Sequence, residues 1–134
     1  ENHDLMTRLR AEKIARIADG LPELEVEGCA DADLLIVGFG GTYGHLHSAM
    51  DELNKAGKKA ALAHFRFINP LPKNTAAVLR KYKKIVVAEQ NLGQLAGYLR
   101  MNIEGIHLYQ FNQVKGQPFV VQELVDAFTK IMEE

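Results

Sequence analysis

The sequence is poor in the residues from which many catalytic and metal sites are built. It has a single cysteine, Cys29, which excludes an internal disulfide and a zinc site made of cysteines. Its one serine, Ser48, falls inside a predicted helix and lacks the flanking glycines of a nucleophile elbow. No apolar run approaches the roughly 20 residues that a membrane-spanning helix needs. The sequence therefore gives no sign of a serine nucleophile, a cysteine-based metal site or a membrane segment.

The sequence also lacks an excess of either charge. Its 16 basic and 17 acidic residues leave a formal charge of −1. Such a balance provides no field that would attract nucleic acid or anionic lipid, so we expect neither as a partner. No signal-peptide pattern is present, and the expected location is the cytoplasm. Because the chain opens on Glu1 and not on methionine, we expect it to be either a piece of a longer chain or a processed product, and the first is favoured.

Apolar residues recur with the periods of alternating strands and helices. The pattern predicts helices over residues 5–18, 45–56, 74–82, 93–103 and 120–132, and strands over 23–27, 34–39, 60–67, 85–88 and 106–111. Most of these strands read as buried on both faces, which is typical of a parallel sheet covered by helices on both sides. The predicted fold is therefore α/β, a three-layer αβα arrangement around a mostly parallel sheet of about five strands with an antiparallel edge strand.

The order of the strands predicts where a site would lie. Right-handed crossovers favour the 34–39 strand at the centre, the 60–67 strand on one side, and the 85–88 and 106–111 strands on the other. The 23–27 strand would pair, antiparallel, with the outer edge of the 60–67 strand. Ligands of open α/β sheets bind at the carboxyl ends of the strands, in the crevice where the strand order reverses. The loops after the 34–39 and 85–88 strands would form that crevice.

This crevice is the candidate site, serving either a ligand or a neighbouring domain. Its predicted residues are Gly40, Gly41, Thr42, Gly44, Glu89, Asn91, Gly93 and Gln94. The glycines of the first loop are expected to shape the turn, and Thr42 to cap the helix that follows. The Glu89 carboxylate either does chemistry or accepts hydrogen bonds from backbone amides or from Thr42. The second role is favoured, because no nucleophile or paired carboxylate accompanies Glu89.

The glycine loop departs from the known nucleotide-binding motifs. Residues 38–43 begin like a dinucleotide fingerprint but place Tyr43 where a small residue is needed, and no P-loop lysine follows. The end of the next strand, residues 64–66, lacks the acidic ribose partner. His45 and His47 are two positions apart on a helix and cannot share a metal. We therefore assign no catalytic, cofactor-binding or metal residue, although a helix N-terminus after the loop could still hold an anion.

Five segments, in order along the chain, share a pattern with one known family. They are Asn2-His3 with Arg8 and Lys13, residues 37–44 (VGFGGTYG), 66–72 (RFINPLP), 87–95 (VAEQNLGQL) and 115–119 (KGQPF). Together they resemble the C-terminal domain of the alpha subunit of 2-oxoacid:ferredoxin oxidoreductases, in particular the 2-oxoglutarate enzymes. This domain belongs to the transketolase C-terminal-like group. The resemblance implies that residues 1–22 are a lead-in helix from the preceding domain and residues 23–134 the domain itself.

The resemblance implies a supporting role inside a larger enzyme. Enzymes of this family use thiamine diphosphate with magnesium, an iron–sulfur cluster and coenzyme A. They decarboxylate a 2-oxoacid oxidatively to acyl-CoA and pass the electrons to ferredoxin. This segment would bind none of these cofactors, and its partners would be the other alpha-subunit domains and the beta subunit, with ferredoxin reached through the whole complex. The implied function is a structural and assembly domain that is not catalytic by itself.

Two other functions stay open at this point. One is an anion- or nucleotide-binding regulatory module that uses the crevice. The other is the C-terminal domain of a transketolase or synthase. Residues 89–94 (EQNLGQ) argue against the second, because those relatives tend towards a more glycine-rich run there.

Overall fold

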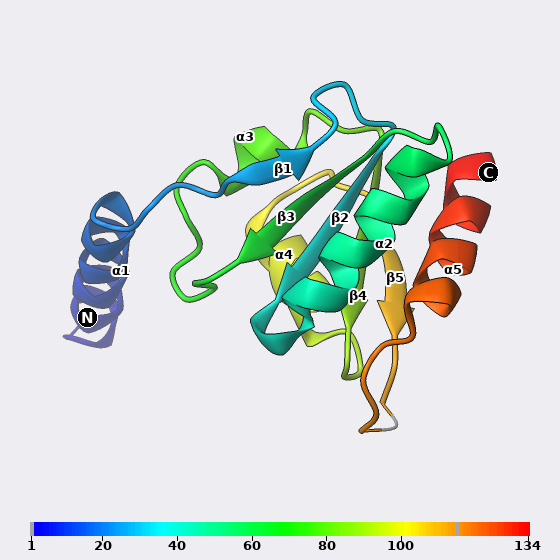
Figure 1. Cartoon of the computed structure of the whole chain (residues 1–134). Coiled ribbons are helices and arrows are strands. Elements are labelled where there is room, and N and C mark those ends of the chain that lie inside the picture. Colours follow the sequence, from blue (N-terminus) through cyan, green and yellow to red (C-terminus); the bar gives the residue numbers. More distant parts are fainter. Residues whose placement is uncertain (1, 115) are drawn as a thin grey trace.

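The fold is built on one five-stranded sheet, seen in a computed structural model that describes residues 2–114 and 116–134 (Figure 1). The strands are β1 Val26–Gly28, β2 Leu34–Phe39, β3 Ala60–Phe65, β4 Lys84–Glu89 and β5 Tyr109–Asn112. They lie in the order β1-β3-β2-β4-β5. β2 to β5 are parallel to one another, and β1 pairs antiparallel with β3. The predicted α/β class, strand order and antiparallel edge are therefore confirmed.

Helices cover both faces of the sheet. The helices of the structure are α1 Asn2–Asp19, α2 Tyr43–Lys55, α3 Thr75–Leu79, α4 Gln94–Asn102 and α5 Val121–Glu133, with a 3-10 turn at Gly40–Thr42. α2 and α5 pack on one face, and α3 and α4 on the other. α1 stands apart from the sheet, joined to it by an extended segment (Figure 1). Among the helices of the described residues, none has the length and apolar character to cross a membrane.

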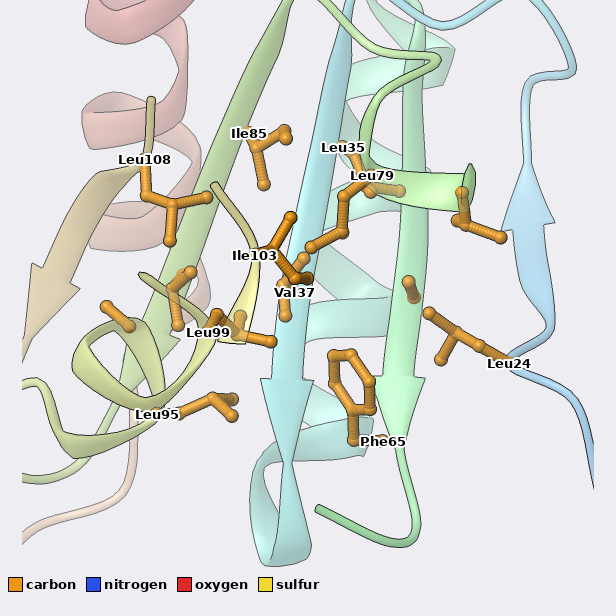
Figure 2. Packing of buried hydrophobic residues seen from close by; sticks show 14 of the residues in the cluster. Leu24, Leu35, Val37, Phe65, Leu79, Ile85, Leu95, Leu99, Ile103 and Leu108 are labelled. Atoms are coloured by element: carbon orange, nitrogen blue, oxygen red, sulfur yellow. The ribbon is translucent and has the colours of Figure 1, made fainter. Parts of the chain in front are cut away.

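The core consists of two apolar layers, one on each face of the sheet. Alternate residues of β2 serve opposite layers, since side chains along a strand point to opposite faces. Leu34 and Ile36 join the layer under α2 and α5, whereas Val37 joins the layer under α4. Figure 2 shows the second layer, where Leu99 of α4 lies near Val37. This packing fixes α4, and with it the loop that leads from β4 into the helix.

The edge strands and α3 differ from the sequence-based expectations. β1 is exposed along its length and β5 alternates between half-buried and exposed residues, so burial on both faces holds only for the central strands. β1 begins at Val26 because the Asn74 side chain pairs with both backbone groups of Leu24, at 2.7 and 3.0 Å. The helix predicted over 74–82 ends at Leu79, where the chain tightens into turns before β4.

Candidate functional site

The predicted crevice exists as a cavity at the carboxyl end of the sheet. It lies beside the boundary between β2 and β4, where the strand order reverses, and has a volume of about 430 Å³. The cavity is lined by Gly41, Thr42, Glu89, Asn91 and Gln94 of the predicted set, and by Phe39, Ile68, Ala88, Gln90, Leu95 and Tyr98. The other three predicted residues, Gly40, Gly44 and Gly93, do not line it. The structure therefore brings five of the eight predicted residues together around one cavity.

Glu89, the last residue of β4, is buried and uses both of its carboxylate oxygens. Oε1 accepts a hydrogen bond from the backbone N–H of Leu95 at 2.6 Å, and Oε2 accepts one from Ala96 at 3.0 Å. These N–H groups belong to the first turn of α4. Backbone N–H groups in a first turn have no hydrogen-bond partner within the helix, and they carry the positive end of the helix dipole. Of the two kinds of donor that were expected as alternatives, backbone amides or Thr42, the structure shows the backbone amides.

Asn91 completes the cap of the same helix. Its Oδ1 accepts hydrogen bonds from the backbone N–H groups of Gly93 at 2.8 Å and Gln94 at 3.1 Å. Gly93 has a φ of +93°, and a Cβ there would come within 2.5 Å of the Gln110 side chain. Between them, Glu89 and Asn91 provide acceptors for four consecutive N–H groups. The amino end of α4 therefore has no free amide among these four to offer a bound anion.

The glycine loop needs glycine at one of its predicted positions only. Gly40 has a φ of +76°, a conformation that side chains other than glycine rarely adopt. Gly41 and Gly44 lack a positive φ, and a Cβ added to either meets nothing within 4 Å. The expectation that all three shape the turn therefore holds for Gly40 alone.

The predicted role of Thr42 as a helix cap is wrong. Thr42 stands at the position before α2 but makes no side-chain cap, and its Oγ1 instead donates to the carbonyl oxygen of Phe39 at 3.4 Å. The reason is the 3-10 turn, which already gives Thr42 a helix-like backbone. In that conformation a threonine hydroxyl turns back to a preceding carbonyl.

His64 of β3 is a residue of the site region that the sequence analysis missed. Its Nε2 lies 2.9 Å from the carbonyl oxygen of Gly40, across from β3 to the glycine loop. Its Nδ1 is buried and has no hydrogen-bond partner among the residues that the structure describes. Burial lowers the pKa of His64 below its ordinary value of 6.5, so the ring favours the neutral form. The parallel register of the structure places His64 opposite Gly38, next to the glycine loop.

Tyr43 replaces the small residue of a nucleotide fingerprint and has a structural use. Its hydroxyl donates to the Glu27 carboxylate of β1 at 2.7 Å, and its ring meets the edge of His64 at a centroid distance of 5.2 Å. This hydrogen bond raises the pKa of Tyr43. Tyr43 therefore ties the start of α2 to the edge strand β1.

The described part of the chain contains no arrangement of side chains suited to metal binding or to thiol catalysis. No group of three or more His, Cys, Asp or Glu residues there could hold a metal ion. His47 lies 3.4 Å from Asp51, one helical turn further along α2. The Cys29 thiol donates to the Asp31 carboxylate at 3.1 Å, and this bond raises the pKa of the thiol. A raised pKa keeps the thiol protonated and lowers its reactivity.

Fold and site together define an αβα domain whose crevice is built from side chains that cap helices and brace loops. Residues 32–124, more than half of the chain, match the family model described as pyruvate:ferredoxin oxidoreductase core domain II. The chain belongs to this family. The resemblance inferred from the five sequence segments is confirmed.

The relatives are alpha subunits of larger enzymes. The chain is 44% identical over 126 residues to the 2-oxoglutarate oxidoreductase subunit KorA of Mycobacterium tuberculosis, covering 92% of this chain and 18% of the relative. It is 28% identical to the alpha subunit of a 2-oxoacid:ferredoxin oxidoreductase of Saccharolobus solfataricus, over 100% of this chain and 22% of the relative. The chain thus spans about a fifth of the length of these curated relatives.

A solved structure shares the fold over nearly the whole chain. It is the 2-oxoglutarate:ferredoxin oxidoreductase of Magnetococcus marinus with 2-oxoglutarate, coenzyme A and succinyl-CoA bound. The match has a TM-score of 0.87 at 30% sequence identity and covers 98% of this chain and 23% of that chain. These findings support the oxidoreductase family and give no support to a regulatory anion- or nucleotide-binding module.

Replacing Glu89 by glutamine tests the helix cap. Glu89→Gln leaves one N–H of the first turn of α4 facing an amide NH₂, so we expect the free energy of unfolding to fall by about 1.5–3 kcal/mol. Hydrogen exchange at Leu95 and Ala96 should become faster. Glu104→Gln, at an exposed carboxylate, is the matched control and should leave both unchanged. Equal effects of the two substitutions in chemical denaturation would contradict the cap.

The pKa of His64 makes stability depend on pH. Since this pKa is lowered in the folded state, the unfolded chain binds the proton first as pH falls. We therefore expect full stability above the ordinary pKa of about 6.5 and a loss below it. His64→Gln should flatten this part of a stability curve measured by denaturation between about pH 7.5 and pH 5. In the control variant His107→Gln, the slope of stability against pH should persist because His64 remains. If the slope also persists in His64→Gln, its assignment to His64 is rejected.

Proposed function

We propose that the chain is a structural and assembly domain of the alpha subunit of a thiamine-diphosphate-dependent 2-oxoacid:ferredoxin oxidoreductase. The whole enzyme would oxidatively decarboxylate 2-oxoglutarate with coenzyme A, giving succinyl-CoA, carbon dioxide and two electrons for ferredoxin. The choice of 2-oxoglutarate is supported by the name of the 44% identical relative and by the substrate held in the Magnetococcus marinus structure. The enzyme would work in the cytoplasm.

The observation that carries a supporting role is the state of the Glu89 carboxylate. Glu89 is the acidic group of the crevice, and both of its oxygens accept hydrogen bonds from the first turn of α4. A carboxylate held this way stabilises a helix end and is fixed in place through both of its oxygens. The crevice therefore contributes shape to the subunit, and the chemistry would take place on other domains.

The cofactors of the whole enzyme do not fit the residues of this chain. An iron–sulfur cluster is held by several cysteine thiolates, and this chain has only Cys29. The described residues also contain no cluster of three or more His, Cys, Asp or Glu side chains that could hold a metal ion. In our proposal thiamine diphosphate, magnesium, the iron–sulfur cluster and coenzyme A are bound by other parts of the enzyme.

The partners that we propose follow from the same arrangement. Residues 23–134 would form the domain, and residues 1–22 would lead into it from a preceding domain of the alpha subunit. α1 fits this role because Leu5, Leu9 and Ile17 are all close to half exposed, as expected for a helix that packs against something else. The beta subunit would be a further partner, and ferredoxin would meet the assembled complex.

An activity assay tests this function. The isolated chain should reduce neither ferredoxin nor a viologen dye with 2-oxoglutarate and coenzyme A, whereas the full alpha–beta enzyme should do so. In the full enzyme, Glu89→Gln should change kcat by less than about threefold, because a catalytic carboxylate would cost on the order of 10²–10⁴. Activity of the isolated chain, or a loss of 100-fold or more in assembled Glu89→Gln enzyme, would refute the proposal.

A further inference from the structure

Each of the four parallel strands ends in an exposed large apolar side chain or has one within the next three residues. Phe39 ends β2 and is 40% exposed, and Phe67 follows β3 at 42%. Leu92 follows β4 at 78%, and Val114 follows β5 at 57%. Single exposed apolar residues are normal on a protein surface. Here four exposed apolar side chains lie within three residues of the carboxyl ends of four neighbouring strands, which gathers them at one edge of the sheet.

These four residues belong to one edge of the molecule. Because β2 to β5 are parallel, their carboxyl ends lie on the same side of the sheet, as their arrowheads show in Figure 1. In the order of the sheet, the residues read Phe67, Phe39, Leu92 and Val114. We call them the carboxyl-edge row. The cavity between β2 and β4 opens beside the row and includes Phe39 in its lining.

Charge is distributed unequally between the two ends of the sheet. The segments after the parallel strands, residues 39–42, 66–74, 90–93 and 113–120, contain three charged residues in the sequence, Arg66, Lys73 and Lys115. The segments before the same strands carry many charges: Asp31, Asp33, Lys58, Lys59, Arg80, Lys81, Lys83 and Glu104. Charged residues are depleted from the buried centres of protein interfaces. The amino end of the sheet, with its many charges, is thus suited to exposure to water. The carboxyl end, with fewer charges, is better suited to contact with another protein surface.

The loops of the carboxyl end are tied to one another. The Gln90 side chain donates to the carbonyl oxygen of Gln117 at 2.9 Å, and the backbone N–H of Gln113 donates to the carbonyl oxygen of Glu89 at 2.8 Å. The Gln113 side chain also donates to Gln117, at 2.9 Å. These bonds connect the loop after β4 to the loop after β5. A surface held in place in this way loses little conformational entropy on binding.

We propose that the carboxyl-edge row is the surface on which the remainder of the alpha subunit docks. The inference rests on the proposed function and adds the contact surface and its occupant. Curated relatives are about five times as long as this chain, so in them most of the polypeptide lies outside this domain. The exposed apolar side chains and the small number of charges fit an apolar protein surface better than nucleic acid, which needs many basic side chains. The occupant is therefore protein from the same subunit.

Hydrogen exchange in two forms of the protein tests the docking. In the full-length alpha subunit, backbone amides of residues 90–94 that exchange freely in the isolated chain should exchange at least tenfold more slowly. The double substitution Leu92→Asn with Val114→Asn should abolish that difference and leave the denaturation midpoint of the isolated chain unchanged. Met101→Asn is the matched control, since Met101 is 85% exposed at the far end of α4 and outside the row. It should leave the protection intact.

The outcomes separate this inference from the proposed function. Equal exchange of residues 90–94 in the isolated chain and the full-length subunit would overturn the docking surface, even in an enzyme that oxidises 2-oxoglutarate. Protection that appears in the isolated chain and grows with its concentration would also overturn it, because the occupant would then be a second copy. Protection in a full-length protein that lacks 2-oxoacid oxidation would support the docking surface and reject the proposed activity.

Discussion

The interaction on which the candidate site depends is the pair of hydrogen bonds from the first turn of α4 to the Glu89 carboxylate. A buried carboxylate is costly unless its charge is balanced by donors, and here two backbone N–H groups provide them. The same bonds fix where α4 begins and how the loop after β4 turns. Leu99 then anchors the helix in the core. These contacts therefore hold α4, the loop after β4 and the adjoining wall of the cavity in fixed positions relative to one another.

The facing side of the crevice is built on the same principle with different groups. Gly40 permits the turn after β2, and His64 reaches its carbonyl oxygen from β3. Tyr43 fastens the start of α2 to Glu27 of β1. These contacts hold the glycine loop and the start of α2 in place. A crevice whose polar groups are engaged in this way presents a defined shape more than a reactive surface.

The sequence predicted the larger features because they depend on periodicity and on general rules of chain topology. The strand order and the place of the crevice follow from the alternation of strands and helices. The contacts of Thr42 and His64 could not be predicted from the sequence. The hydroxyl of Thr42 is directed by a 3-10 turn, and the contact of His64 joins residues 24 positions apart. The start of β1 was misplaced because a distant side chain, Asn74, competes for its backbone.

The central claim is that the Glu89 carboxylate caps α4, and comparing the NMR amide-proton shifts of the labelled chain with those of its Glu89→Gln variant tests it most directly. The account predicts that the amide protons of Leu95 and Ala96 move upfield in the variant, because they lose a carboxylate as hydrogen-bond acceptor. Amide signals of both residues that stay fixed would contradict it.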